Sequence, residues 1–418
     1  MYAETSVAQI LINNLNDDCL LHIFKFVNGI DLIHLEAVCQ RTQKLCPLIW
    51  KEIRSFDVNS NKLCDKLHTK NKSDKVKIYK SVLLRSYRYL TEVNLSSHAN
   101  FQNTTSMRAK HACDEIKLEG ALDDVRHALS NCEKIQELSL CKCMLKCDND
   151  YLGRIFKKNT NLRSIALCGY GFIGECLTQL PFGTIESIVL RHCYELELQY
   201  TNLFATIAHK LHTLRLFHVD GFDMSELGFD EYDDDLDYDI RNICDFNLLK
   251  NLRFLELSDA ELFDDDLKPI VENCIHLKFL DVSFNFDLTN VGFLYISSLA
   301  HLLYLNISSN YDFKDEGLEK LTKNLRELNV SQTRFTANGL LNFLRGAQNL
   351  EKLTVAFMRK LNNSFIRSAA KIVKSRPENT QVIIEIQGTS VKTSRLNDIG
   401  PIIQLNEGKP SDSFDKYV

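Results

Sequence analysis

An aliphatic pattern, L-x-x-L-x-L, recurs about every 25 residues from residue 90 onward, and it constrains the fold more than any other feature of the chain. Alternate residues of a strand point to opposite faces, so each copy can bury its aliphatic side chains on one face. Units stacked in this way offer many side chains on one long surface, which favours binding a macromolecule. The clear copies are Leu90-Val93-Leu95, Ile135-Leu138-Leu140, Leu162-Ile165-Leu167, Ile185-Ile188-Leu190, Leu211-Leu214-Leu216, Leu252-Leu255-Leu257, Leu277-Leu280-Val282, Leu302-Leu305-Ile307, Leu325-Leu328-Val330 and Leu350-Leu353-Val355, and two poorer copies end at Leu118 and Ile386.

The second half of each unit has the pattern of a short helix. The segments DLTNVGFLYI, FKDEGLEKL and FTANGLLNFL follow three successive copies, and each has a glycine near its start with a polar residue ahead of it that suits a helix cap. We therefore predict an α/β fold, a right-handed leucine-rich-repeat solenoid (a horseshoe) with about 12 units between residues 90 and 390. The glycines are Gly292, Gly317 and Gly339, and the predicted caps are Thr289, Asp315 and Thr336.

The copies of the aliphatic pattern form a ladder along the chain. One interval of this ladder, from Leu216 to Leu257, is much longer than the others because it contains an acidic insert at residues 220–246. Ten Asp and Glu residues lie between Asp220 and Asp239. A calcium loop is disfavoured because Tyr238 stands where such a loop needs glycine. We interpret the insert as a solvated loop, and the alternative is a rim element that attracts a basic partner.

Residues 12–54 differ from the repeats and predict a small all-α domain of three helices. The first helix carries Leu20, Ile23, Phe24 and Val27 at helical spacing. So small a core is stabilised best by packing against a neighbouring domain or a partner. The predicted caps are Asn16 and Asp17 for the first helix and Asp31 for the second, while the predicted stops are Asn28-Gly29 for the first and Pro47 for the third.

The remaining segments are assigned by composition. Residues 1–11 form an N-terminal arm, and residues 55–89 form a basic linker followed by a capping helix over 76–89. The lysines of the linker are interpreted as solvated, with a nuclear-targeting or anion-binding patch as the alternative. Residues 391–418 form a polar C-terminal tail for which disorder is one expectation.

Composition excludes several classes of protein. A hydrophobic share of 44%, a charged share of 25% and a net charge of −5 fit a soluble globular protein and give no reason to expect a nucleic-acid partner. Neither a signal peptide nor a membrane span is predicted, so we expect no membrane partner and a cytoplasmic or nuclear location, or both. In that setting the fourteen cysteines are expected to be reduced.

Neither a metal site nor a catalytic site is predicted. Cys141, Cys143 and Cys147 are close in sequence, but zinc usually needs four ligands in two paired clusters. Cys143 and Cys193 instead fill a slot of the repeat that Asn285 and Asn310 fill in other units, where the side chain satisfies backbone groups of the turn. We expect Cys132 and Cys274 to be buried at helix ends. The chain lacks the P-loop, HExxH, GxGxxG and nucleophile-elbow motifs, so we predict no catalytic residue and no cofactor.

Residues between the ladder positions should face the inner side of the solenoid in columns. Phe254, Phe279 and Tyr304 form a column of aromatic residues on successive strands, which we expect to be exposed and to bind a protein target. The alternative is that these stacked rings only hold adjacent strands together. The other predicted target-binding residues are Arg215, Phe217, Glu256, Asp281 and Asn306.

The opening segment resembles an F-box. The matching residues are Leu15-Asn16-Asp17-Asp18-Cys19-Leu20-Leu21-His22-Ile23-Phe24, then Asp31-Leu32, Val38-Cys39-Gln40-Arg41 and Leu48-Ile49-Trp50. Two positions depart from the family pattern: Asn16 replaces a proline, and Thr42 stands where a second tryptophan is common. The repeats resemble the cysteine-containing leucine-rich subtype found in F-box proteins.

The resemblance implies the substrate receptor of a Skp–cullin–F-box ubiquitin ligase. The box would bind a Skp-type adaptor and, through it, a cullin–RING complex, while the repeats would hold a protein target. The chain itself would do no bond chemistry and would act by raising the local concentration of the target. The residues expected to contact the adaptor, or to support those contacts, are Leu15, Leu20, Ile23, Phe24, Leu32, Val38 and Trp50.

Three other functions remain open at this point. The first is a repeat scaffold with a degenerate box that acts outside ubiquitin transfer. The second is a GTPase activator, for which no loop arginine or asparagine stands out. The third is a secreted receptor, which the missing signal segment opposes.

Overall fold

The computed structural model describes ten stretches of the chain, and their fold divides into two compact units. Unit 1 comprises Met1–Ala99, Arg108–Cys168 and Gln179–Thr184, and unit 2 comprises Asn100–Met107, Gly169–Thr178 and Ile185–Val418. The predicted N-terminal arm, nearly all of the acidic insert, the ladder copy ending at Leu118, and Cys143, Cys147 and Cys193 lie outside the described residues. The described residues are 14–57, 72–95, 122–141, 148–168, 174–191, 210–217, 246–376, 381–396, 399 and 401–407.

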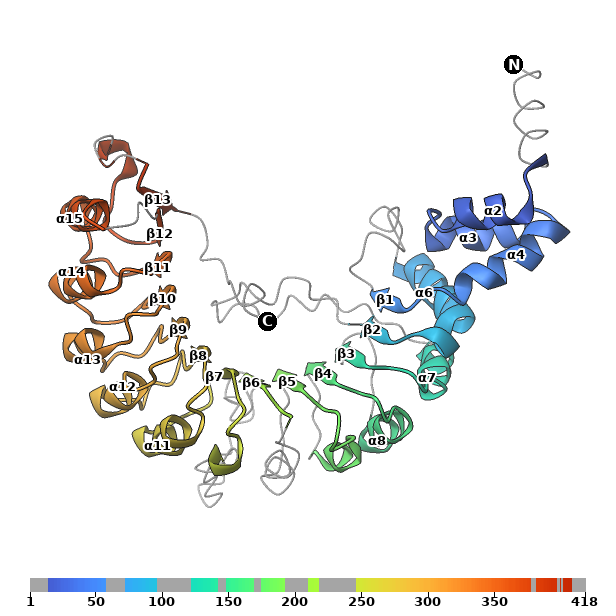
Figure 1. The fold of residues 1–418 in the computed structure, drawn as a ribbon, viewed down its shortest axis with the longest axis horizontal. Helices are drawn as coiled ribbons and strands as arrows, with labels where there is room; N and C mark the ends of the chain where they lie inside the picture. Colours follow the sequence, from blue (N-terminus) through green and yellow to red (C-terminus); the bar gives the residue numbers. More distant parts are fainter. Residues whose placement is uncertain are drawn as a thin grey trace, which may run out of the picture. The chain divides into compact units, whose positions relative to one another are not determined.

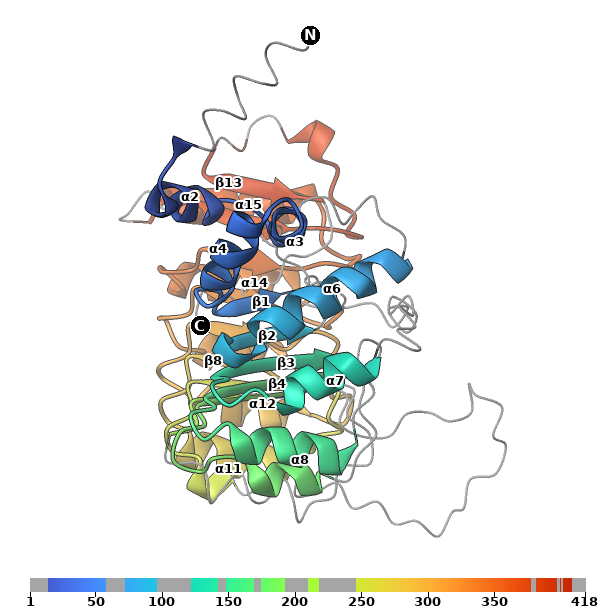
Figure 2. The same ribbon diagram turned by 90° about the vertical axis from the view of Figure 1, so that its right-hand side faces the viewer.

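Unit 1 begins with the three predicted helices, α2 (Asp17–Phe24), α3 (Gly29–Glu36) and α4 (Gln40–Trp50). Helices α2 and α3 both contact α4, while α3 and α4 contact the longer helix α6 (Lys72–Ser86), as Figure 2 shows. The small core of the three helices therefore continues into α6, which agrees with the expectation that it needs a neighbour.

The helix limits differ in part from those predicted. Asn16 caps α2 by accepting a hydrogen bond from the Cys19 amide at 2.8 Å, as predicted. The cap of α3 is Asn28 and not Asp31, because the Asn28 side chain accepts from the Asp31 amide at 2.9 Å. Pro47 lies inside α4, which continues to Trp50, so the prediction that it ends this helix is wrong.

Four parallel strands of unit 1 pair in sequence order: β1 (Ser55–Asp57), β2 (Glu92–Leu95), β3 (Glu137–Cys141) and β4 (Ser164–Cys168). Strand β1 was missed, because residues 55–57 lie in the predicted linker and carry one buried apolar residue, Phe56. Its pairing with β2 joins the N-terminal helices directly to the sheet. The helical segments of this part are the 3₁₀ turn η2 (Tyr87–Tyr89), α7 (Leu122–Ser130) and α8 (Asn149–Lys158).

Unit 2 follows the predicted order of strand, turn and helix. Its strands lie along the inner side of an arc and its helices along the outer side (Figure 1). Neighbouring strands pair in parallel and in ladder register, so that Leu255, Leu280 and Leu305 lie side by side and fully buried. This confirms the predicted leucine-rich-repeat fold. The strands are β5 (Ser187–Arg191), β6 (Thr213–Phe217), β7 (Phe254–Ser258), β8 (Phe279–Asp281), β9 (Tyr304–Asn306), β10 (Glu327–Asn329), β11 (Lys352–Thr354), β12 (Val382–Glu385) and β13 (Ile403–Asn406).

The helices of unit 2 pack against one another from one repeat to the next. Thr289 and Thr336 cap α12 and α14 as predicted. Asp315 is instead the first residue of α13, and its carboxylate accepts from the Thr336 amide at 3.0 Å in the next unit. A side chain in place of Gly339 would overlap that carboxylate, which explains the recurring glycine. The helices are α11 (Asp264–Asn273), α12 (Asn290–Ile296), α13 (Asp315–Lys320), α14 (Ala337–Gly346) and α15 (Asn363–Lys374), with 3₁₀ turns η7 (Phe246–Leu248) and η8 (Thr393–Arg395); a further turn, η5 (Glu175–Gln179), lies between β4 and β5 in sequence.

Asn285 and Asn310 have the role that the repeat register predicts. The Asn285 side chain accepts from the Ala260 and Leu262 amides at 3.0 Å and donates to the Leu257 carbonyl at 2.8 Å. Asn310 in turn accepts from the Asn285 amide at 3.0 Å. Both side chains are fully buried, so each asparagine satisfies backbone groups that have no strand partner.

The last strand corrects the assignment of residues 391–418 as a polar tail. Strand β13 (Ile403–Asn406) pairs with β12 over four residues and extends the sheet. Ile403 is buried, as is Leu396. Alternation of two apolar residues, Ile403 and Leu405, was too short a signal to predict a strand between Pro401 and Pro410.

Candidate functional site

The seven residues predicted to serve the adaptor separate into a core set and a surface set. Ile23 and Val38 are exposed at 46% and 69%. Leu15 is half-buried. The other four build the core of the three helices and are at most 4% exposed: Leu20, Phe24, Leu32 and Trp50. The sequence pattern could not separate these sets because both follow helical spacing.

Trp50 is an internal anchor and not a contact surface. It is 2% exposed, and its indole N–H donates to the Glu36 carboxylate. That carboxylate also accepts from Arg85 of α6, with Nε to Oε2 at 2.7 Å. Trp50 thus links α4, α3 and α6, so of the two predicted roles its burial fits support of the adaptor-binding residues and not direct contact.

Two exposed apolar residues of the same segment were missed. Phe26 is 80% exposed in the turn after α2, and Leu48 is 42% exposed on α4. Phe26 lies outside the helical periodicity of α2, and its ring contacts only the edge of His22 among the described aromatic rings, at 5.4 Å between centroids. The exposure of Phe26 is what marks it as a candidate for a contact with a partner, and the structure gives this exposure whereas the sequence does not.

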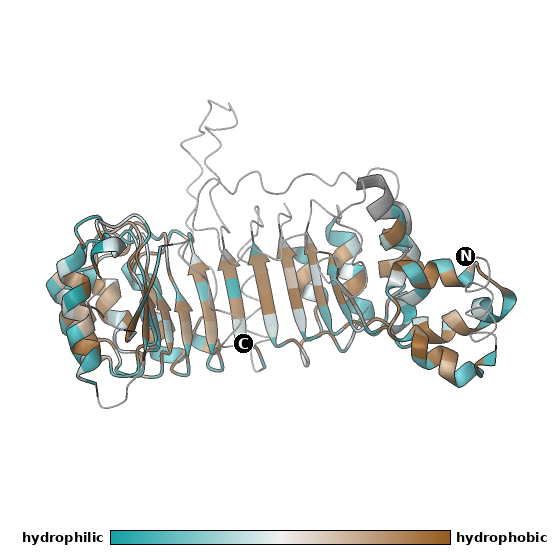
Figure 3. Cartoon of the chain, turned by 90° about the horizontal axis from the view of Figure 1, so that it is seen from above, coloured by the Kyte–Doolittle hydropathy of each residue, from teal (hydrophilic) through white to brown (hydrophobic). Residues whose placement is uncertain are grey.

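Phe26 and Val38 line a surface depression of about 460 Å³ between the end of α2 and α3. Its other lining residues include Val27, Leu35 and Asp31. Figure 3 shows that these helices carry both hydrophobic and hydrophilic residues. An apolar depression rimmed by polar groups is typical of a protein-binding surface. Phe26 and Val38 line this depression, and Ile23 is exposed on α2 outside its lining. We define the three exposed residues Ile23, Phe26 and Val38 as the apolar face.

The two departures from the F-box pattern have structural roles. Asn16 caps α2, as described above. Thr42 forms a capping box with Cys39 at the start of α4, and its hydroxyl accepts from the Cys39 amide at 3.2 Å. Arg41 then ties α4 to α2 through Asp17, with Nη2 to Oδ1 at 2.7 Å. Both replacements therefore contribute hydrogen bonds at helix starts.

The predicted target-binding side chains of unit 2 that the structure describes are not exposed. Phe254, Phe279 and Tyr304 are 6%, 1% and 6% exposed and form one cluster. The rings of Phe279 and Tyr304 stack with centroids 4.1 Å apart. Parallel strands bring like residues of each column into contact, so each ring covers the next. The alternative reading, that the rings hold adjacent strands together, is the one that these contacts support.

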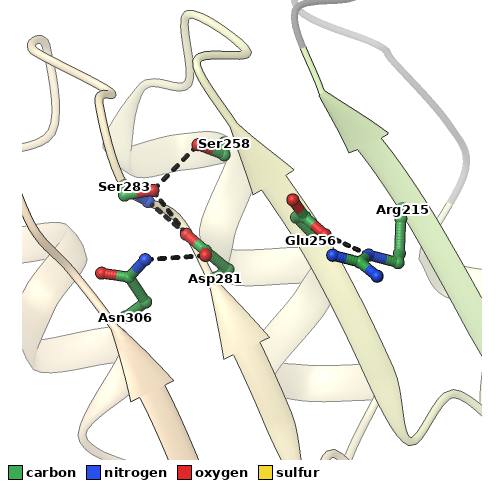
Figure 4. Close-up of polar contacts among 6 residues, drawn as sticks. All are labelled: Arg215, Glu256, Ser258, Asp281, Ser283 and Asn306. Atoms are coloured by element: carbon green, nitrogen blue, oxygen red, sulfur yellow. Dashed lines mark hydrogen bonds and ion pairs between the residues drawn. The ribbon is translucent and has the colours of Figure 1, made fainter. Parts of the chain in front are cut away.

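The polar column beside these rings forms a buried network, drawn in Figure 4. Arg215 of β6 pairs with Glu256 of β7, and both are 6% exposed. Asp281 accepts from the Asn306 side chain at 2.7 Å and from the Ser283 hydroxyl at 2.6 Å. The strand of Phe217 is described, but its side chain lies outside the described residues.

Burial sets opposite protonation preferences within this network. Burial and, after it, the neighbouring Glu256 carboxylate raise the pKa of Asp281 to about 7, while hydrogen bonds from Ser283 and Asn306 oppose the rise. Burial also favours the neutral form of Glu256, yet the guanidinium groups of Arg215 and Arg191 outweigh it and hold the pKa of Glu256 below its ordinary value. A buried, largely satisfied network of this kind specifies strand packing more than it attracts a ligand.

The described cysteines at helix ends are structural. Cys132 and Cys274 are fully buried, as predicted, and burial raises the pKa of each thiol to about 12. Within the described stretches, no group of three or more His, Cys, Asp or Glu residues could hold a metal ion. None of the helices described is both long and apolar enough to cross a membrane.

Comparison with known proteins identifies the N-terminal helices. Residues 12–49 match the family model of the F-box domain. None of the curated proteins compared with the chain matches it. Similar solved structures include an internalin from Listeria monocytogenes, with 13% identity over 91% of this chain and 95% of that one and a TM-score of 0.46. Another is a chain of the yeast Rad7–Elc1 complex, with 14% identity over 68% of this chain and 84% of that one and a TM-score of 0.36. The chain therefore carries an F-box domain at residues 12–49, and the strand-and-helix repeats that follow it have the leucine-rich-repeat fold.

Proposed function

We propose that the chain is the substrate-recognition subunit of a Skp–cullin–F-box ubiquitin ligase. The observation that carries the proposal is the apolar face of Ile23, Phe26 and Val38, on an F-box whose core is already filled by its own residues. When a partner covers large apolar side chains that a folded domain leaves exposed, the burial of this apolar surface stabilises the complex. The Skp-type adaptor is that partner in this proposal.

The ligase role requires no catalytic group from this chain. Its contribution is to hold a target protein close to the ubiquitin carrier, which raises the effective concentration of the target's lysines. Unit 2 is suited to this task because its strands pair in a fixed register, which repeats the turns beside them at regular spacing along a long surface. The expected sites of action are the cytoplasm, the nucleus or both.

Co-purification tests the adaptor contact. The tagged chain is expected to retain a Skp-type adaptor, and Val38→Asp is expected to lose it because a charge would be buried in an apolar contact. Ile275→Asp is the matched control, since Ile275 is 54% exposed in unit 2, far from the F-box in sequence. Retention by wild type and Val38→Asp alike would contradict the proposed contact.

The same experiment separates the proposal from its alternative. A repeat scaffold acting outside ubiquitin transfer would bring down no adaptor and no cullin with the wild-type chain. The exposed apolar face favours the ligase reading, because a box without an adaptor would gain nothing from keeping Phe26 80% exposed.

A further inference from the structure

Unit 2 has a surface of its own with the properties of a binding groove. It runs along the amino ends of strands β6 to β11, where the residues directly ahead of each strand line a cleft of about 920 Å³. Its lining differs from the predicted target-binding columns, since the residues come from the turns before the strands. We define this cleft as the rim groove.

The charge of the rim groove is opposite to that of the whole chain. Lys210, Arg253, Lys278 and Arg326 line it with one carboxylate, Glu351, whereas the chain carries a net charge of −5. Arg326 pairs with Glu351 at 3.3 Å. Among the residues that the structure describes, no carboxylate lies within 4.0 Å of the other three cationic groups, and all three residues are exposed. Three uncompensated cations on neighbouring strands favour an anionic ligand.

The other lining groups suit a peptide. Asn251, Asn324 and Asn349 line the groove at corresponding positions of their repeats. The Asn324 and Asn349 side chains donate to the Ala300 and Lys323 carbonyls at 3.3 and 3.5 Å, and an amide has a second N–H and a carbonyl oxygen with which to bond to a peptide backbone. His276 and His301 add polar rings in the turns ahead of β8 and β9. Six strands about 4.8 Å apart span roughly 24 Å, which accommodates about seven residues of an extended chain.

We propose that the rim groove binds an extended, carboxylate-rich segment of the target protein. This inference rests on the proposed function for the statement that the partner is a target, and it adds the chemical class of the segment. A single nucleic-acid strand is a poorer fit, since three uncompensated cations are few and the lining residues of the groove include no Phe, Tyr or Trp on which bases could stack.

Fluorescence anisotropy with the full chain tests the inference. The probe is a labelled peptide of about eight residues that alternates Glu and Ser. We expect binding that weakens as salt is raised, because the cations are exposed. The double variant Arg253→Glu/Lys278→Glu should weaken binding about tenfold or more, since it places like charges opposite the peptide. The matched control Lys371→Glu/Lys374→Glu makes the same charge change at exposed positions of α15 and should stay within about twofold of wild type.

Several results would overturn the inference. These are failure of the wild-type chain to bind the acidic peptide, an equal loss in the α15 control, or tighter binding of a single-stranded oligonucleotide that Arg253→Glu/Lys278→Glu also abolishes. Adaptor co-purification is measured on the same samples. A wild-type chain that retains the adaptor but does not bind the peptide refutes the rim groove alone, whereas a wild-type chain that binds the peptide but retains no adaptor refutes the ligase role alone.

Discussion

The buried carboxyl group of Asp281 predicts an unusual dependence of stability on pH. Its pKa is raised from 3.8 to about 7 by burial and by Glu256. Below pH 3.8 the group is protonated in both the folded and the unfolded chain, and its contribution to stability is then fully present. As the pH rises towards 7 the unfolded chain loses the proton first, so the stability contributed by this group is lost.

The size of the effect follows from the interval between the two pKa values. Each pH unit is worth about 1.4 kcal/mol, so the full loss is at most about 4 kcal/mol. The part of this loss of stability that falls between pH 5.5 and pH 8 is about 2 kcal/mol. Asp281→Asn removes the ionisation, and its free energy of unfolding should therefore fall by about 2 kcal/mol less than that of wild type over this range.

Urea unfolding followed by circular dichroism at both pH values measures this difference. Asp287→Asn is the matched control, because Asp287 is exposed and sits in the turn after the same strand. Comparing each protein with itself at two pH values cancels the cost of the altered hydrogen bonds to Ser283 and Asn306. If wild type and Asp281→Asn lose the same free energy between pH 5.5 and 8, the carboxyl is ionised in the folded chain throughout and the reasoning is wrong.

Two further predictions concern packing. Asn285→Ala leaves the buried amides of Ala260 and Leu262 without an acceptor and should lower the free energy of unfolding by about 3 kcal/mol or more. Thr333→Ala, which removes a turn hydroxyl that donates to the Val330 carbonyl, should cost about 1 kcal/mol, and equal costs in urea titrations would contradict the structural role of Asn285. Trp50→Ala should destabilise the F-box by about 3 kcal/mol or more and lose the adaptor through unfolding, while Trp50→Phe keeps a ring in the core and should retain adaptor binding; a folded Trp50→Phe protein that fails to bind in co-purification would show that Trp50 is itself a contact.

The repeat fold was largely predictable because each ladder copy has aliphatic residues at the same positions, and these residues are buried in the same way. The aliphatic residues at Leu277, Leu280 and Val282 are all fully buried, and parallel pairing in ladder register follows from repeating them. Strands β1 and β13 were missed because each carries only one or two apolar residues and is recruited by the edge of an existing sheet. Recruitment of that kind is a tertiary effect that local periodicity does not encode.

The site was less predictable than the fold. Sequence placed Phe254, Phe279 and Tyr304 on one column correctly, but it could not say whether the rings cover one another or face solvent. It also could not distinguish Trp50, which is internal, from Phe26, which is exposed. In each case the outcome depends on neighbouring elements such as α6, whose contacts are not written in the local pattern.

The affinity of the purified chain for a purified Skp-type adaptor tests the central claim most directly. Calorimetric titration is expected to show tight binding by wild type, and Phe26→Ala and Ile23→Ala should each lose about 2 kcal/mol, or about thirtyfold in Kd, if they anchor the contact. Val291→Ala, which truncates a residue 51% exposed in unit 2, should bind as wild type does. Unchanged affinity in both apolar-face variants, or no binding by a folded wild-type chain, would contradict the claim that this face holds the adaptor.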